Sequence, residues 1–303
     1  MANKFVKKGL LDIDIVETTP IVWKGNLWRC EWYRPEHYAN TEHNSCGRFI
    51  NMETGEVSAT FADGQCFHSA YTENDMLYVY SVNGFSTAAG HNTVNLYRSN
   101  DMVNWEKSIA LTQPEDWQFF NNSVCRRGDQ YYMALEIGQP AEITGAPFTV
   151  VYAISDNLTE WKMLDPRKYV YTKEFYSACP VIRWSDGYFY IIYLENQPNL
   201  KYNFAPFIVR TQDLEHYERY PYPIFEYEDG KEDKYIRNKA QFTPEQIAYI
   251  EASEDNNNSD VDLCDYNGKT IILYAWGNQL GREFLAEAEY DGPSSEWFAS
   301  FFK

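Results

Sequence analysis

The stretch CPVIRWSDGYFYIIYLE, residues 179–195, holds the pattern that decides the fold: a short apolar strand, a turn with Gly, and a strongly aromatic strand. Tyr, Phe, Val and Ile favour strands, and an Asp-Gly turn between two such runs indicates a β-hairpin. Four other stretches repeat the pattern. They are TPIVWKGNLWRCEWY (19–33), HSAYTENDMLYVYSV (68–82), NSVCRRGDQYYMALEIG (122–138) and DVDLCDYNGKTIILYAWG (260–277), of which 68–82 has Asn-Asp in place of the Gly turn. The sequence therefore predicts five copies of one hairpin.

A second motif recurs downstream of three hairpins. It reads SNDMVNWEK (99–107), SDNLTEWK (155–162) and TQDLEHYE (211–218), and its aromatic residues at 105, 161 and 217 are each 56 positions apart. A looser copy, YDGPSSEW, spans 290–297. Asp and Asn favour tight turns, and the aromatic ring is suited to cover the edge between neighbouring units. We predict that each copy is a β-turn joining two outer strands.

Five units over 303 residues give about 61 residues each, which fits four-stranded antiparallel blades arranged radially. We predict an all-β, five-bladed β-propeller that forms one domain over residues 1–303. An open β-sandwich or a two-domain chain would not explain five matched copies. The main interruption is 231–256, where Thr243 as N-cap and Pro244 at the first helical position predict one short helix inserted before the last blade.

Composition limits the possible partners. There are 44 Asp and Glu residues against 26 Lys and Arg, a formal charge of -18 that repels nucleic acid and anionic lipid. The sequence contains no apolar run long enough for a signal peptide or a membrane span, so we expect no membrane association and a cytoplasmic location. The alternative is a secreted form whose signal peptide has been removed. Six dispersed cysteines are expected to be buried free thiols. We expect no metal and no cofactor; the oligomeric state is left open.

The strand starts TPIV and ACPVI, the GYFYIIYLE strand and the SxDxxxW-type turns together resemble the five-bladed propeller glycoside hydrolases of families 43, 32, 62 and 68. The resemblance covers nearly the whole chain. It implies an active site at the propeller axis, with carboxylates at the starts of the innermost strands and furanosides or xylosides as substrates. The usual acidic positions are substituted. The chain has Thr19 and Asn122 where family 43 has Asp in blades one and three, and Ala178 where blade four has Glu.

Other carboxylates are positioned to replace them. Residues that end the second strand of a propeller hairpin lie beside those that start the first, and Glu136 and Glu195 both follow an aromatic-apolar run. Glu17 precedes the first inner strand, and Asp260 begins the fifth. We predict catalytic roles for these four, with Glu195 or Glu136 as acid and Glu17 or Asp260 as base or nucleophile. For Glu136 and Glu195 the alternative is a structural ion pair with a neighbouring blade. For Asp260 it is a turn after the Asn-rich loop, and for Glu17 it is a surface position.

Five further residues are candidates for substrate binding. Asp262 shares a face with Asp260 and is also a candidate base, while Asn122 and His68 lie at inner-strand starts. Arg34 could clamp a sugar hydroxyl, and Trp276 could stack on a sugar face. The leading hypothesis is a glycoside hydrolase that acts on a small glycoside or oligosaccharide in a central acidic pocket. The alternatives are a catalytically silent carbohydrate-binding propeller and a glycoside phosphorylase.

Overall fold

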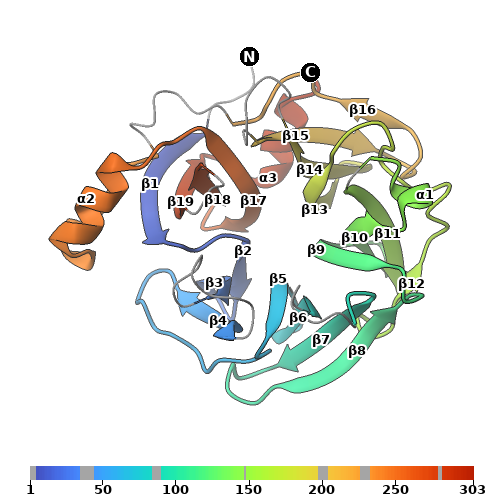
Figure 1. Ribbon diagram of the computed structural model, residues 1–303, viewed down its shortest axis with the longest axis horizontal. Coiled ribbons are helices and arrows are strands. Elements are labelled where there is room, and N and C mark those ends of the chain that lie inside the picture. The colour runs from blue at the N-terminus through green and yellow to red at the C-terminus, as the bar shows by residue number, and fades with distance from the viewer. Residues whose placement is uncertain are drawn as a thin grey trace.

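The protein is described by a computed structural model that covers residues 5–34, 44–83, 90–146, 148–196, 204–225, 233–278 and 282–303. Five antiparallel sheets are arranged around a central axis, with β2, β5, β9, β13 and β17 innermost (Figure 1). The predicted five-bladed, all-β propeller is therefore confirmed.

The sheets follow one another along the chain as blades 1 to 5. Blade 1 contains β2 (Thr18–Trp23), β3 (Asn26–Tyr33) and β4 (Cys46–Asn51). Blade 2 contains β5 (Gln65–Glu73), β6 (Met76–Asn83), β7 (Thr93–Ser99) and β8 (Glu106–Thr112). Blade 3 contains β9 (Gln118–Arg127), β10 (Gln130–Gln139), β11 (Thr149–Ser155) and β12 (Lys162–Met163). Blade 4 contains β13 (Ala178–Ser185), β14 (Tyr188–Asn196), β15 (Phe204–Thr211) and β16 (Tyr217–Arg219). Blade 5 contains β17 (Asn257–Tyr266), β18 (Lys269–Gly277), β19 (Glu283–Tyr290) and, from the other end of the chain, β1 (Val6–Ile13).

Two blades depart from four consecutive strands. Blade 1 has three strands among the described residues, and isolated bridges at Gly47–Phe61 and Ile50–Val57 occupy the outer edge. Blade 5 takes its fourth strand from the N-terminal part of the chain, because β1 pairs with β19. This pairing closes the ring.

All five predicted hairpins are present, and each pairs an inner strand with its neighbour through a two-residue turn. Asp186 and Gly187 have φ values of 50° and 83°, as a type I′ turn requires. Asn267 and Gly268, at 50° and 80°, do the same in blade 5. Turn chemistry read from the sequence is thus what sets the register of these hairpins.

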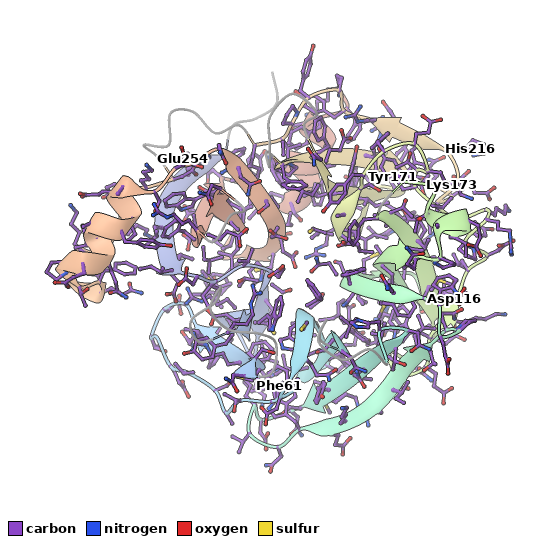
Figure 2. The ribbon with its side chains drawn as sticks, viewed as in Figure 1. Phe61, Asp116, Tyr171, Lys173, His216 and Glu254 are labelled. Carbon is purple, nitrogen blue, oxygen red and sulfur yellow. The ribbon has the colours of Figure 1, made fainter. Side chains whose placement is uncertain are left out.

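The three motifs that are spaced 56 residues apart form the same turn structure. In each, a Ser or Thr hydroxyl accepts the amide of a Met or Leu three residues on: Met102, Leu158 and Leu214 donate over 2.9, 3.0 and 2.9 Å. The aromatic residue that ends the repeat contacts the preceding blade, as Trp161 contacts Tyr80 at a centroid distance of 5.6 Å. The turns lie on the outer rim, where Figure 2 shows His216.

The fourth, looser copy at 290–297 differs from the prediction. It leads into helix α3 (Ser294–Ser300) and not into an outer strand. The outer position of blade 5 is occupied by β1, so the segment after β19 does not form an outer strand. Trp297 still keeps the packing role, because it is fully buried in the core.

The predicted insertion is confirmed as helix α2 (Pro244–Ala252), which projects from the ring beside β1 in Figure 1. Thr243 caps it, and the Thr243 hydroxyl and the Gln246 side chain form a reciprocal capping box. Residues 231–232 of the expected interruption lie outside the described residues. Short helices also occur at α1 (Ala141–Thr144) and at η2 (Lys239–Gln241). In the described part of the chain, the helices are all too short or too polar to cross a bilayer.

The hydrophobic core lies mainly between blades. One cluster joins residues of blades 2 and 3, another those of blades 3 and 4, and a third those of blades 4 and 5. Aromatic side chains fill these interfaces, which accounts for the high aromatic content. The six cysteines are free thiols as expected; Cys46, Cys179 and Cys264 are only half-buried.

Candidate functional site

Five residues in equivalent positions surround the axis where the inner strands begin. Each lies six residues before the turn-flanking residue of its own hairpin. They are Glu17, Phe67, Asn121, Cys179 and Asp260, and all five line one cavity. Four of them have left-handed backbones, with φ between 44° and 55°. This conformation is unfavourable for residues other than glycine, so the fold imposes it at the point where the chain enters the inner strand.

A second set comes from the returning strands. The residue six positions after the one that follows the turn is Trp32, Val82, Glu136, Leu194 or Ala275 in blades 1 to 5. Of these, Trp32, Glu136 and Leu194 line the cavity. Glu136 is therefore the one carboxylate that the returning strands supply at this level.

The cavity has a volume of about 280 Å³ and adjoins a smaller pocket of about 30 Å³, with which it shares Glu17, Asn121, Cys179 and Asp260. We call this smaller pocket the floor pocket. Four carboxyl groups line the cavity, from Glu17, Glu136, Asp260 and Glu283. Its aromatic walls come from Trp32, Phe67, Phe120, Phe148, Tyr176 and Phe204. An acidic, aromatic cavity of this kind is suited to bind a small polar molecule with an apolar face, such as a sugar.

Glu136 is held in a fixed position. Its Oε2 accepts hydrogen bonds from the Cys179 backbone amide at 2.8 Å and from Asn121 Nδ2 at 3.1 Å. Burial raises the pKa of Glu136 to about 7, although these hydrogen bonds oppose the shift. The carboxyl group is therefore divided between its protonated and ionised forms at neutral pH.

Asp260 lies in the same hydrogen-bonded chain. Burial raises its pKa, while hydrogen bonds from Ser259 and from the Cys179 thiol favour the ionised form. The Cys179 sulfur in turn accepts from Asn121 Nδ2 at 3.3 Å. Cys179 thus connects the two carboxyl groups through its backbone amide on one side and its thiol on the other.

Glu17 and Arg34 form an ion pair at the cavity wall, with Oε2 and Nη2 3.8 Å apart. Arg34 also stacks on Trp32, with its guanidinium carbon 3.7 Å from the ring centroid. Burial, and then the neighbouring Asp260 carboxylate, raises the pKa of Glu17 well above its ordinary value. The acids of this cavity therefore influence one another's protonation.

Besides Glu17 and Asp260, three further predicted residues line the floor pocket. Asn122 donates to the Phe67 carbonyl at 3.4 Å, and His68 Nδ1 contacts the Ser81 hydroxyl at 2.7 Å. Burial lowers the pKa of His68 to about 3, so its imidazole is neutral at pH 7. Asp262 lies 2.6 Å from Arg183 and is therefore already paired.

Two predicted residues are not brought to the cavity. Glu195 pairs with Arg219 at 2.8 Å and accepts from Tyr193 at 2.6 Å. Trp276 is fully buried and stacks on Phe284, with centroids 4.2 Å apart. Both lie one residue beyond the position that Glu136 occupies in its strand. A shift of one residue turns a strand side chain to the opposite face.

Sequence reasoning missed several cavity residues. Glu283 begins β19, a middle strand of blade 5 from which no site residue was expected. Asn121 and Tyr176 precede their predicted hairpins by a few residues. Counting six positions outward from the two residues that flank every two-residue turn would have found Asn121 and separated Glu136 from Glu195. In the described part of the chain, no cluster of three or more His, Cys, Asp or Glu side chains is arranged to hold a metal ion.

Comparison with known proteins gives matches by structure alone. Neither the family models nor the curated proteins that were searched match this sequence. A solved glycoside hydrolase aligns over 97% of this chain and 94% of its own, with a TM-score of 0.65 and 12% identity. A thermostable family-43 glycoside hydrolase aligns over 94% and 92%, with a TM-score of 0.63 and 9% identity. This chain shares the propeller fold of glycoside hydrolases.

A third similar structure is larger. A mutant of the Bombyx mori family-32 β-fructofuranosidase, in complex with sucrose, aligns over 92% of this chain but 61% of its own, with a TM-score of 0.58 and 13% identity. At these identities the likeness concerns the fold, and the chemistry must be argued from the cavity.

Proposed function

We propose that the protein is a glycoside hydrolase that cleaves a small glycoside in the axial cavity, with Glu136 as general acid and Asp260 as base or nucleophile. The observation that supports this most strongly is the state of Glu136. It is 4% exposed, fixed by two hydrogen bonds to one oxygen, and has a pKa raised to about 7. A general acid needs a pKa close to the working pH.

Asp260 is the better partner in this reaction than Glu17. Hydrogen bonds from Ser259 and Cys179 favour its ionised form, whereas Glu17 lies beside three other carboxyl groups that disfavour a further negative charge. Glycoside hydrolysis needs one carboxylic acid and one carboxylate on opposite sides of the scissile bond. We assign the carboxylic acid to Glu136 and the carboxylate to Asp260, because hydrogen bonds to Asp260 oppose the rise of its pKa. Whether the anomeric configuration is retained or inverted follows from the product anomer, which NMR can identify.

The cavity favours a single sugar unit inside. Its volume of about 280 Å³ lies at the lower end of small-molecule sites. The rings of Trp32, Phe148 and Tyr176 offer apolar faces on which a pyranose or furanose can stack. The family-32 neighbour was solved in complex with sucrose, which is also a small glycoside.

A binding protein without catalysis is the second candidate, and one observation favours it. Thr19, Asn122 and Ala178 stand where the resemblance implies acidic residues. A phosphorylase is less favoured, because Arg34 is the one basic side chain among the described residues of the cavity wall. A phosphate ion would meet four carboxyl groups there.

The test is hydrolysis of a panel of aryl furanosides and pyranosides. We expect Glu136→Gln to lower kcat/KM by about 10²–10⁴, the usual contribution of a general acid, and Asp260→Asn to lower it at least as much. The parent should lose activity as pH rises through about 7, because Glu136 must be protonated to donate. The matched control is Glu195→Gln, which lies outside the cavity and should leave kcat/KM unchanged. Absence of turnover on every substrate by folded protein would favour the binding protein.

A further inference from the structure

The axial cavity holds more acidic groups than hydrolysis employs. Two carboxyl groups carry out glycoside hydrolysis. Four line this cavity, those of Glu17, Glu136, Asp260 and Glu283. Arg34 is the one basic residue among the described lining residues, and the neutral imidazole of His68 adds no positive charge at the floor. Four carboxyl groups beside one basic residue favour a ligand that brings positive charge, because a cation stabilises their ionised forms.

Two buried acceptor atoms support this reading independently. The side-chain oxygen of Asn122 and Oε2 of Glu17 have no hydrogen-bond donor among the described residues. Asn122 is 5% exposed, and its amide orientation is set by donation to the Phe67 carbonyl, which leaves the oxygen as an unused acceptor of the floor pocket. The Arg34 guanidinium, at 3.8 Å from Glu17 Oε2, is beyond hydrogen-bond distance. Buried polar atoms in native proteins are normally satisfied, so a donor-rich group is expected here.

The size of the floor pocket restricts that group. About 30 Å³ accommodates one water-sized group. An ammonium group is of this size, and it offers three donors and a positive charge. A hydroxyl group offers one donor and no charge, so it would leave at least one of the acceptors unsatisfied.

We propose that the substrate carries a protonated amine, as an amino sugar does, and that its ammonium group binds in the floor pocket between Glu17, Asp260 and the amide oxygen of Asn122. This inference rests on the proposed function for its link to catalysis, but not for binding itself. The aromatic walls add cation–π attraction as the amine enters. Uronic acids and sugar phosphates are repelled by the same carboxylates.

The experiment is isothermal titration calorimetry with glucosamine, galactosamine and mannosamine, each beside its neutral parent sugar, its N-acetyl derivative and the corresponding uronic acid. At a pH below the pKa of the amine, we expect at least one amino sugar to bind at least tenfold more tightly than its neutral counterparts. The preference should weaken with added salt and disappear above the pKa of the amine. Glu17→Gln and Asn122→Ala should each reduce it, whereas the control Glu195→Gln should not.

Three results at the amine site overturn the inference. Neutral sugars that bind as tightly as the amines, a preference that survives in both variants, or no binding of any amine to protein with a native near-UV spectrum would each do so. Calcium and sodium ions are each tested first without the amine, by thermal unfolding, and then in competition with it. If an ion raises the Tm of the parent but not of Asn122→Ala, and also displaces the amine, the floor pocket is a metal site and the inference is overturned. Amine binding without turnover of any glycoside refutes the hydrolase and leaves the amine site standing. Turnover of neutral glycosides without any binding of amines supports the hydrolase and refutes the amine site.

Discussion

Arg183 connects three blades across the axis, and its replacement offers a quantitative test of how the floor of the site is held. Its Nη1 donates to the Ser123 hydroxyl in β9 at 3.1 Å and to the carbonyl of Ile182 at 2.9 Å. Its Nη2 donates to Asp262 at 2.6 Å and to the Leu263 carbonyl in β17 at 2.7 Å. Arg183→Met would keep much of the side-chain volume and remove all four hydrogen bonds.

The expected loss follows mainly from Asp262, whose side chain is 10% exposed and would lose its counter-charge. Removing one partner of a buried pair costs about 3–5 kcal/mol. Burial already raises the pKa of Asp262, so protonation relieves part of the penalty. We therefore expect Arg183→Met to lower the free energy of unfolding by about 3 kcal/mol at neutral pH, and by less as pH falls.

Urea unfolding followed by tryptophan fluorescence measures this loss. The double variant Arg183→Met/Asp262→Asn is the matched control, because it removes the uncompensated charge and should recover part of the stability. A single variant within about 1 kcal/mol of the parent would refute the reasoning, since surface pairs behave in that way. So would a double variant that is no more stable than the single one.

Two further predictions concern residues outside the cavity. Burial and the neighbouring Asp233 raise the pKa of Asp255 to about 8 in the folded protein, whereas an unfolded chain has an aspartate pKa of about 4, so stability falls as pH rises between these two values. Asp255→Asn should flatten this fall between about pH 4 and 8 in thermal unfolding, and an unchanged profile would contradict this. Trp276→Ala should cost about 3–5 kcal/mol in urea unfolding because it removes the ring stacked on Phe284, whereas Trp276→Phe should cost less; a folded Trp276→Phe protein with weakened sugar binding would contradict a purely structural role.

Local chemistry explains why most of the fold could be predicted. Dipeptides such as Asp186-Gly187 specify their turn type, and strand propensity on both sides specifies a hairpin. The 56-residue repeats marked the outer turns because one Ser or Thr with one Asp or Asn is sufficient to form the structure. The prediction that residues 290–297 lead into an outer strand was wrong, because the outer strand of blade 5 is β1, which pairs with β19 from the other end of the chain. No local signal reports that an outer strand has been supplied from elsewhere in the chain.

The site was harder to predict because it depends on register. Glu136 and Glu195 look equivalent when aligned by their aromatic runs. However, Ala134 pairs with Ser123 and Ile192 pairs with Val181, so the residue of blade 4 that is equivalent to Glu136 is Leu194. One residue therefore separates a cavity carboxyl group from an ion pair on the other face. The pKa of Glu136 depends on burial by other blades, which the sequence pattern does not contain.

The closure of blade 5 by β1 has a consequence for the order in which the chain can fold as it is synthesised. Val6 pairs with Glu289, so about 280 residues separate the partners. At roughly 5–20 residues per second, the ribosome needs roughly 14–56 s to make the partner strand after the first has emerged. For that time β1 has no strand to pair with, and the cavity carboxylates of blades 1 and 5 remain apart. The ring, and with it the site, is completed last.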